Sequence, residues 1–169
     1  MTERVRGHRL RTFRALAANR ALPVVEIALL RSLPLFAELP GPTIEALAAS
    51  LTPAELPAGT VLIRQGDPGD AYYAIAAGEL DVRQDGHFLR RYGRGEGVGE
   101  IALLHSIPRT ATVIARSDAT VYQLNREPFL SAVLSHAQTY REASRIAGAW
   151  LAADVARDHP PGPSPAQLD

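Results

Sequence analysis

The chain has 169 residues, 46% of them hydrophobic, and its 18 basic and 18 acidic side chains leave it with no net charge. This length supports one folded domain with extensions and a sizeable core. The absence of Cys excludes disulfides and thiolate metal sites and favours a reducing cytoplasm. No apolar run approaches the length of a membrane span, and the N-terminus has no signal-peptide core.

Charge is distributed unevenly along the chain. Residues 1–20 hold six Arg against one Glu, a balance of +5, whereas the remainder holds twelve Arg against 17 acidic residues, a balance of −5. We expect residues 1–32 to form an Arg-rich helical extension that contacts anionic lipid, contacts another part of a larger protein, or serves only as a solvated connector. Because such segments lie on the cytoplasmic side of membrane proteins, a membrane domain upstream of residue 1 is a further interpretation. The acidic body argues against a nucleic-acid partner.

The first elements after this basic segment are predicted to be helical. A helix is expected over residues 24–33, with Leu30 and Leu33 on its apolar side. A second helix should start with Thr43 as its N-cap.

Residues 51–125 change to short β runs separated by turn residues. Asp85-Gly86 is typical of a two-residue hairpin turn. Many short strands with such turns indicate a sandwich or a jelly-roll barrel, and with the helices they indicate the α+β class. The expected strands cover residues 60–63, 71–75, 79–82, 87–89, 110–115 and 120–124.

The C-terminal part is predicted to be helical again. Asn125 should cap a helix that ends near residue 134, and a long Ala-rich helix should follow over about 137–157. Residues 158–169 are Pro-rich and predict a disordered tail. No helix-turn-helix fits into so short a tail.

Residues 95–113 combine groups that suit a phosphate attached to a sugar. Three glycines allow the backbone to approach a ligand closely. The short helical turn that Glu100 begins would present free N–H groups to an anion, and Arg109 could aim its guanidinium fork at the same anion. Glu100 would repel the phosphate but could accept a hydrogen bond from a neighbouring sugar hydroxyl. The three glycines are Gly95, Gly97 and Gly99.

This segment resembles the phosphate-binding cassette of cyclic nucleotide-binding domains. The matching residues are Gly99-Glu100-Ile101-Ala102-Leu103-Leu104 and Pro108-Arg109-Thr110-Ala111-Thr112. The family includes the catabolite activator protein, the regulatory subunits of cAMP-dependent kinase and cyclic nucleotide-gated channels. The resemblance covers roughly residues 33 to 150. It selects an antiparallel jelly-roll barrel flanked by N-terminal helices, and implies a domain over 33–157 that includes a C-terminal lid helix.

The resemblance also implies roles for individual residues. Arg109 would bind the phosphate and Glu100 the ribose 2′-hydroxyl, while Thr110 would give its hydroxyl to the phosphate or to a purine edge. The remaining contacts implied are Gly99, Ile101, Ala102 and Ala111 in the cassette, and Ile63, Val82, Leu89 and Tyr92 along the base, each of which also suits ordinary core. The candidates for the lid are Arg141, Arg145 and Trp150, of which Trp150 is expected mainly to pack its helix onto the barrel.

Two positions depart from the family pattern. Val98 and Gly97 stand where the family commonly has aromatic residues. Both changes remove packing around the cassette, and we expect them to affect its affinity and stiffness and not the class of ligand.

The leading hypothesis is a non-enzymatic sensor that binds cAMP or, by a small margin second, cGMP and closes its last helix. It needs no cofactor, and the five His residues show no metal-ligand spacing. A bacterial membrane transporter or channel, or another fused or partner protein, would receive the signal at the cytoplasmic face of the membrane. A free-standing cytoplasmic sensor, homodimeric through the last helix, is the second variant.

Two other classes of protein compete with this hypothesis. One is a transcription regulator related to the catabolite activator protein that lacks its DNA reader. The other is a degenerate jelly roll that serves as an interaction or dimerisation module. An enzyme is not expected, because the chain has no nucleophile elbow and no lysine for a P-loop.

Overall fold

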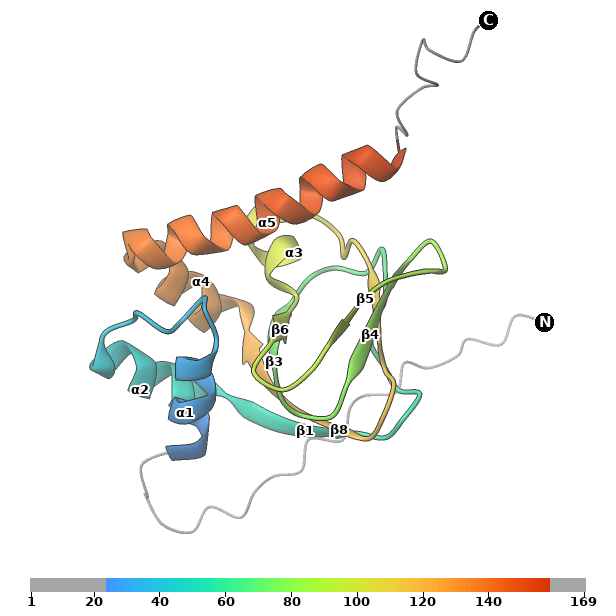
Figure 1. Cartoon of the computed structure of the whole chain (residues 1–169). Helices are drawn as coiled ribbons and strands as arrows, with labels where there is room; N and C mark the ends of the chain where they lie inside the picture. Colours follow the sequence, from blue (N-terminus) through green and yellow to red (C-terminus); the bar gives the residue numbers. More distant parts are fainter. Residues whose placement is uncertain (1–23, 159–169) are drawn as a thin grey trace, which may run out of the picture.

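Two four-stranded antiparallel sheets and their flanking helices make up residues 24–158, the part of the chain that the computed structural model describes (Figure 1). The basic helix predicted within residues 1–20 and the predicted tail beyond Asp158 lie outside the described residues. The first sheet has the order β1-β8-β3-β6 and the second the order β2-β7-β4-β5. Both are antiparallel throughout, which confirms the predicted jelly-roll architecture and the α+β class.

Six strands follow the predicted runs with small shifts at their ends, and two short ones, β1 and β6, were not predicted. Their bounds are β1 (Thr52–Leu56), β2 (Val61–Ile63), β3 (Ala71–Ala77), β4 (Leu80–Gln84), β5 (His87–Tyr92), β6 (Gly97–Val98), β7 (Thr112–Ala115) and β8 (Ala119–Asn125). The hairpin turn at Asp85 and Gly86 is confirmed, since both have positive φ, 50° and 79°, as a type I′ turn requires.

Strand β3 is buried on both of its faces, which explains why its sequence is a continuous apolar run. Its alternation divides the core into two clusters. Tyr73 and Ile75 face the space between the sheets, whereas Tyr72 and Ala74 face the helices. One cluster therefore lies inside the barrel, where a ligand cavity can form, and the other joins the barrel to the helices.

The helices are α1 (Val24–Ser32), α2 (Gly41–Ser50), α3 (Glu100–His105), α4 (Arg126–Ser135) and α5 (Ala137–Asp158). The N-cap predicted at Thr43 is wrong. The N-cap lies three residues earlier, at Pro40, and α2 begins at Gly41, because Pro42 in the first turn favours that start. Asn125 is the N-cap of α4 as predicted, although its side chain makes no capping hydrogen bond.

Aromatic contacts join the helices to the barrel. The ring of Tyr72 is stacked on Phe129 with centroids 5.2 Å apart, and Phe36 meets it edge-on at 5.5 Å. All three side chains are almost fully buried. A movement of the α1–α2 connection or of α4 would therefore displace Tyr72 and, through it, strand β3.

One residue separates the last two helices. His136 has an extended backbone, φ −127° and ψ 107°, between Ser135 at the end of α4 and the start of α5. Its Nε2 lies 3.4 Å from the hydroxyl of Thr43 on α2. From this joint α5 runs across the barrel above α3 (Figure 1).

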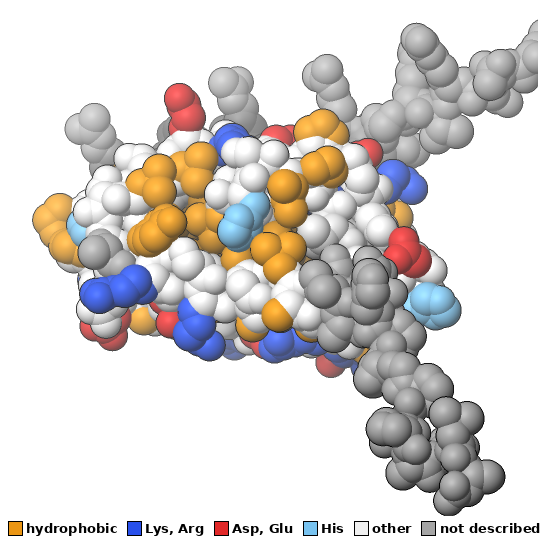
Figure 2. Space-filling view, turned by 90° about the horizontal axis from the view of Figure 1, so that it is seen from above, with side chains coloured by type: hydrophobic (Ala, Val, Ile, Leu, Met, Phe, Trp, Pro, Cys, Tyr) orange, Lys and Arg blue, Asp and Glu red, His pale blue; other side chains and the backbone are white. Residues whose placement is uncertain are grey.

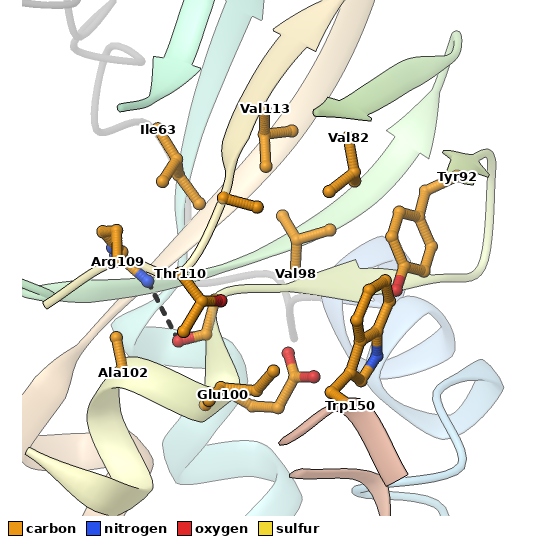
Figure 3. Close-up of a pocket in the computed structure, with 13 residues that line it drawn as sticks. Ile63, Val82, Tyr92, Val98, Glu100, Ala102, Arg109, Thr110, Val113 and Trp150 are labelled. Carbon is orange, nitrogen blue, oxygen red and sulfur yellow. Dashed lines mark hydrogen bonds between the residues drawn. The ribbon is translucent and has the colours of Figure 1, made fainter. Parts of the chain in front are cut away.

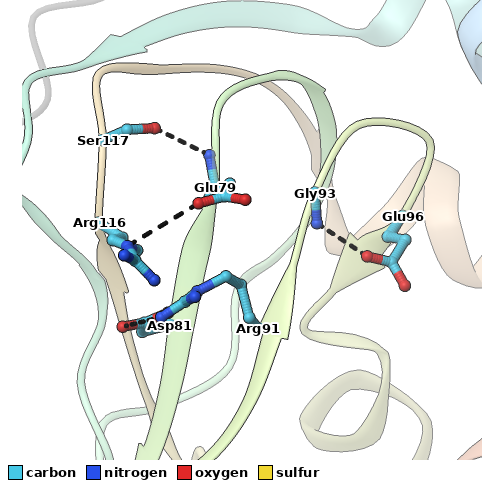
Figure 4. A network of polar contacts seen from close by, with 7 residues as sticks. All are labelled: Glu79, Asp81, Arg91, Gly93, Glu96, Arg116 and Ser117. Carbon is cyan, nitrogen blue, oxygen red and sulfur yellow. Dashed lines mark hydrogen bonds and ion pairs between the residues drawn. The ribbon is translucent and has the colours of Figure 1, made fainter.

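Most arginines of the second sheet are held in polar contacts on its outer surface (Figure 4). Arg91 donates to the Asp81 carboxylate at 2.7 Å, and Arg116 lies 3.8 Å from Glu79. The Arg116–Glu79 pair is exposed and the Arg91–Asp81 pair partly so, and ion pairs at a protein surface contribute little to stability. We assign them no role in ligand binding. Among the described residues, no helix combines the length and apolar character that a membrane crossing needs.

Candidate functional site

A cavity opens between the two sheets beneath α5, with apolar side chains on its walls and a few polar groups at one end (Figure 3). Its empty volume is about 440 Å³, part of which is open to solvent. This combination is typical of a small-molecule site. The lining residues are Ile63, Val82, Tyr92, Val98, Gly99, Glu100, Ile101, Ala102, Arg109, Thr110, Ala111, Val113 and Trp150.

Arg109 is the cation of the cavity, and its guanidinium is fixed before any ligand arrives. Nη1 donates to the carbonyl of Gly99 at 2.9 Å and Nη2 to the carbonyl of Ala71 at 2.5 Å. The side chain is only 5% exposed, and its ionic neighbour is Asp70, 3.6 Å away and itself 84% exposed. Burial lowers the pKa of Arg109 from its usual range, and Tyr73 and Asp70 oppose this shift. A buried guanidinium with a weakly held counter-ion favours an anionic ligand.

The loop that carries Arg109 is tied to the loop before β3. The main-chain N–H of Arg109 donates to Asp67 and its carbonyl accepts from Gly66, both at 2.8 Å. These two bonds hold the loop just past Pro108, from which Arg109 was predicted to aim its guanidinium at an anion. Arg109 is therefore fixed twice by hydrogen bonds to main-chain groups, once at its own backbone and once at its guanidinium.

Gly99 is the residue that gives Arg109 its place. It has φ +104°, and a Cβ there would lie 2.7 Å from Nη1 of Arg109 and 2.9 Å from the carbonyl of Ala71. Any side chain would both strain the backbone and push the guanidinium away. The glycine is thus needed for the charge of the cavity as well as for the turn into α3.

Glu100 is the buried acid of the cavity. It begins α3, is 5% exposed, and its carboxylate points into the cavity in Figure 3. Burial raises the pKa of Glu100, while main-chain N–H groups, Arg109 and Arg90 oppose the rise. A buried carboxylate in a mostly apolar cavity suits a ligand that offers a hydroxyl.

Two aromatic side chains close the other end of the cavity. The rings of Tyr92 and Trp150 are tilted against one another with centroids 6.4 Å apart. Burial, together with the nearby Glu100, raises the pKa of Tyr92 to about 12. Trp150 is partly exposed and comes from α5, so the long helix contributes one wall of the cavity.

The structure brings most of the predicted site residues to one cavity. The cassette residues, the three base-lining residues Ile63, Val82 and Tyr92, and Trp150 all lie on its walls. Leu89 instead lines a smaller hollow beside the cavity. Val98 and Val113 also line the cavity and were not predicted as lining, although the alternation of β7 places Val113 inward.

Arg141 and Arg145 do not line the cavity. They border a separate depression between α5 and the α1–α2 connection, and Arg145 pairs with Glu142 on its own helix. The helix period explains the difference, because Trp150 lies on the cavity side of α5 and both arginines are exposed. For these two residues the predicted lid role is not supported.

The missing aromatic residue at Gly97 has a structural explanation. A Cβ on Gly97 would lie 1.8 Å from the hydroxyl oxygen of Tyr72 and 2.4 Å from its Cζ. The tyrosine therefore fills the space that a side chain at position 97 would use, and the packing comes from β3 instead of β6.

A cavity with one fixed cation, one buried acid and apolar walls suits the binding of a small ligand. Among the described residues, no group of His, Asp and Glu could hold a metal ion. A family model described as "Cyclic nucleotide-binding domain" matches residues 53–136. The chain belongs to the cyclic nucleotide-binding domain family, which confirms the resemblance and makes the domain a regulatory module and not an enzyme.

Regulatory subunits of protein kinases are among the proteins similar to this chain. The cAMP-dependent protein kinase regulatory subunit of Aspergillus niger is 38% identical over 104 residues, which are 60% of this chain and 25% of that protein. This chain thus spans about a quarter of the length of that relative.

Two solved structures show the same fold. The regulatory domain of Toxoplasma gondii PKA with cAMP is 29% identical with a TM-score of 0.64, covering 68% of this chain and 46% of that one. A mutant regulatory subunit of a cAMP-independent protein kinase A from Trypanosoma brucei, bound to cAMP in its A site, is 27% identical with a TM-score of 0.65. That match covers 72% of this chain and 47% of that one.

Proposed function

We propose that the domain is a regulatory sensor that binds a 3′,5′-cyclic purine nucleotide, with cAMP as its first ligand. The cyclic phosphate would lie against the guanidinium of Arg109, and Glu100 would accept a hydrogen bond from the ribose 2′-hydroxyl. The purine would lie between the apolar wall and Trp150. The observation that carries the proposal is the pair of buried opposite charges in one apolar cavity, each on the residue that the cassette assigns to it.

The Trypanosoma brucei relative supports this choice of ligand. Its cAMP-bound mutant carries three substitutions, of which the first introduces an Ala, the second an Arg seven positions later, and the third an Ala directly after that Arg. In this chain the same interval separates Ala102 from Arg109, and Thr110 follows. Ala102 and Arg109 both line the cavity. Two of the three introduced residues therefore recur in this chain at the same spacing, and the third, an Ala in that mutant, is Thr110 here.

Isothermal titration with cAMP and with cGMP tests the proposal directly. We expect saturable binding of one molecule per chain, weakened roughly thirty-fold to several thousand-fold by Arg109→Ala, because an unpaired buried charge costs about 2–5 kcal/mol. Arg116→Ala is the matched control, since Arg116 lies in an exposed ion pair outside the cavity. Absence of binding at millimolar concentrations of both nucleotides would refute the proposal.

We propose further that the ligand acts by stabilising α5 against the cavity. Trp150 gives α5 a direct contact with the site, and the single residue between α4 and α5 allows the long helix to rotate about it. A ligand shifts such an equilibrium only by its differential affinity for the two arrangements. Hydrogen exchange should show that saturating cAMP protects the amides of α5; equal exchange with and without ligand would contradict the coupling.

The effector and the assembly state are also proposals. The basic N-terminal residues favour a membrane transporter, whereas the kinase regulatory subunits among its relatives favour a partner enzyme; fusion or co-purification partners distinguish the two.

The face that carries α5 shows apolar side chains across its middle and charged ones mostly nearer the rim (Figure 2). We therefore propose α5 as the interface if the domain forms homodimers, which sedimentation with Tyr140→Arg would test, since Tyr140 is 47% exposed there.

A further inference from the structure

Arg126, the first residue of α4, has a guanidinium that meets only neutral acceptors among the described residues. Its Nη2 donates to the hydroxyl oxygen of Ser106 at 2.8 Å, and its Nη1 lies 3.5 Å from the carbonyl oxygen of Gly69. The ion pairs of the described residues involve other arginines. A guanidinium that donates to a hydroxyl and a carbonyl keeps its charge uncompensated and has further N–H donors to offer. The position therefore suits an anion beside Ser106.

Ser106 is the acceptor in this contact and lies at the surface of the cassette. It is the C-cap of α3, with φ 51° and ψ 41°, and it begins an irregular segment that runs to residue 111. Its side chain is exposed. Because the left-handed conformation ends α3 at this point, the serine stands in irregular backbone that a modifying enzyme can reach.

We propose that Ser106 is a phosphorylation site and that Arg126 holds the phosphate. In the transfer, the hydroxyl oxygen of Ser106 attacks the terminal phosphorus of a nucleoside triphosphate bound to a protein kinase. The new O–P bond forms as the bond to the nucleoside diphosphate breaks, and the hydroxyl proton passes to the base of that kinase. The product has three strong acceptor oxygens and a charge of about −1.5 to −2, which match the planar fork of a guanidinium already in contact with the serine oxygen.

The phosphate would tie the cassette to α4. The main-chain N–H of Arg126 donates to the carbonyl of Asp70 at 3.0 Å, and the carboxylate of Asp70 is the ionic neighbour of Arg109. The N-terminus of α4 is the positive end of its helix dipole and also attracts a phosphate, whereas the C-terminal end of α3 repels one. Arg126 therefore decides whether phosphorylation stabilises or destabilises the domain.

The added charge also acts on the cavity, because Ser106 precedes Arg109 by only three residues. The reach of the chain keeps the Cα atoms of the two residues within about 11 Å of one another. Resting on the proposed function, in which the ligand is an anion, the phosphate should weaken cyclic nucleotide binding roughly two- to ten-fold at low ionic strength and less at high salt. Phosphorylation of Ser106 would thus raise the nucleotide concentration to which the sensor responds.

The test installs phosphoserine at position 106 of the full chain during translation, with and without Arg126→Gln. Phosphoserine at position 50 is the matched control, since Ser50 is also an exposed serine at the C-terminal end of a helix, and its hydroxyl donates to the carbonyl of Ala46. In ³¹P NMR titrations, the phosphate at position 106 should have a second pKa roughly half a pH unit or more below the value of about 6 of an unpaired phosphoserine. With Arg126→Gln, and at position 50, it should titrate near that value.

Thermal unfolding and nucleotide titration of the same proteins complete the test. Phosphate at position 106 should raise the melting temperature by roughly 2 °C or more, and should lower it in Arg126→Gln. Titration curves and melting shifts that are the same with and without Arg126→Gln would overturn the pairing. Equal affinity for cAMP at low salt in the phosphorylated and unphosphorylated chains would overturn the effect on the ligand.

Phosphopeptide mapping of the chain from its own cells tests whether the modification occurs. It should find phosphate on Ser106, and an unmodified Ser106 in both growing and starved cells would overturn the assignment. If the unphosphorylated chain binds neither cAMP nor cGMP, the proposed function fails, whereas the ³¹P titration and the mapping still decide the phosphorylation site.

Discussion

Tyr72 and Gly97 should be coupled energetically, because the tyrosine ring occupies the space that a side chain at position 97 would need. A Cβ at position 97 would lie 1.8 Å from the Tyr72 hydroxyl oxygen, and Cβ contacts under 3.0 Å essentially do not occur. Gly97→Ala therefore forces the ring to retreat by at least 1.2 Å, the difference between these distances. The retreat is blocked by Phe129 and Phe36, whose ring centroids lie 5.2 and 5.5 Å away.

Overpacking of a well-packed core costs about 1–3 kcal/mol, and a displacement of this size belongs at the upper end. For a domain of this size about 3 kcal/mol lowers the melting temperature by about 10 °C. Tyr72→Phe removes the hydroxyl and leaves Cζ as the nearest atom, 2.4 Å from the new Cβ, so that the required retreat falls to 0.6 Å. We expect Gly97→Ala to cost about half as much in the Tyr72→Phe background.

The measurement is a double-mutant cycle by thermal unfolding of wild type, the two single variants and the double variant. Equal losses of melting temperature in both backgrounds, or a loss under about 2 °C in wild type, would show that the ring is not held in place. The aromatic packing that the family has around its cassette would then remain unexplained in this chain.

Three further predictions concern the cavity. Arg109→Lys should bind cAMP at least ten-fold more weakly than wild type and lower the melting temperature, because a single ammonium nitrogen cannot stand in the places of both Nη1 and Nη2, which donate to the carbonyls of Gly99 and Ala71; affinity equal to wild type in titration would contradict this. Burial raises the pKa of Glu100 above its ordinary value of 4.5, so ionisation costs the folded state stability, and the ligand-free domain should weaken as the pH rises through that raised pKa. Glu100→Gln should therefore melt higher than wild type near pH 7 and lose this advantage near pH 4, and thermal scans that show a constant difference would refute the assignment. Trp150 is the single Trp of the chain, so its fluorescence should change on cAMP binding; Trp150→Ala should weaken binding by the roughly 1–3 kcal/mol of a base–aromatic stack, while Tyr140→Ala on the same helix should leave the affinity unchanged.

The sequence predicted most of the barrel because turn chemistry and apolar alternation are local signals. The Asp85-Gly86 turn and the apolar run of β3 each identify their element without reference to the rest of the chain. Strand β1 was not predicted, since Thr52–Leu56 contains Pro53 and becomes a strand only by pairing with β8. Strand β6 has only two residues and is likewise defined by its partner β3.

The cassette was predictable from its motif, and the surrounding wall only in part. Gly99, Glu100 and Arg109 lie within a short stretch, so their spacing alone brings them together. The orientation of α5 depends instead on how it packs against α3 and α4, and the sequence did not separate Trp150 from Arg141 and Arg145. The displacement of Leu89 from the main cavity depends on the bulge in β5, which leaves it between Phe88 and Arg90 without a cross-strand pair and which no local pattern signals.

The single-residue joint at His136 has a kinetic consequence. On the proposed coupling, full occupation of the cavity follows an outward swing of the long helix, because Trp150 of α5 forms part of the cavity wall. Observed association rates should therefore level off at high nucleotide concentration, at the speed of this swing, instead of climbing without limit. A shortened or stiffened joint would slow both entry and escape, and the lifetime of the signal would then be set by a hinge that touches neither phosphate nor base.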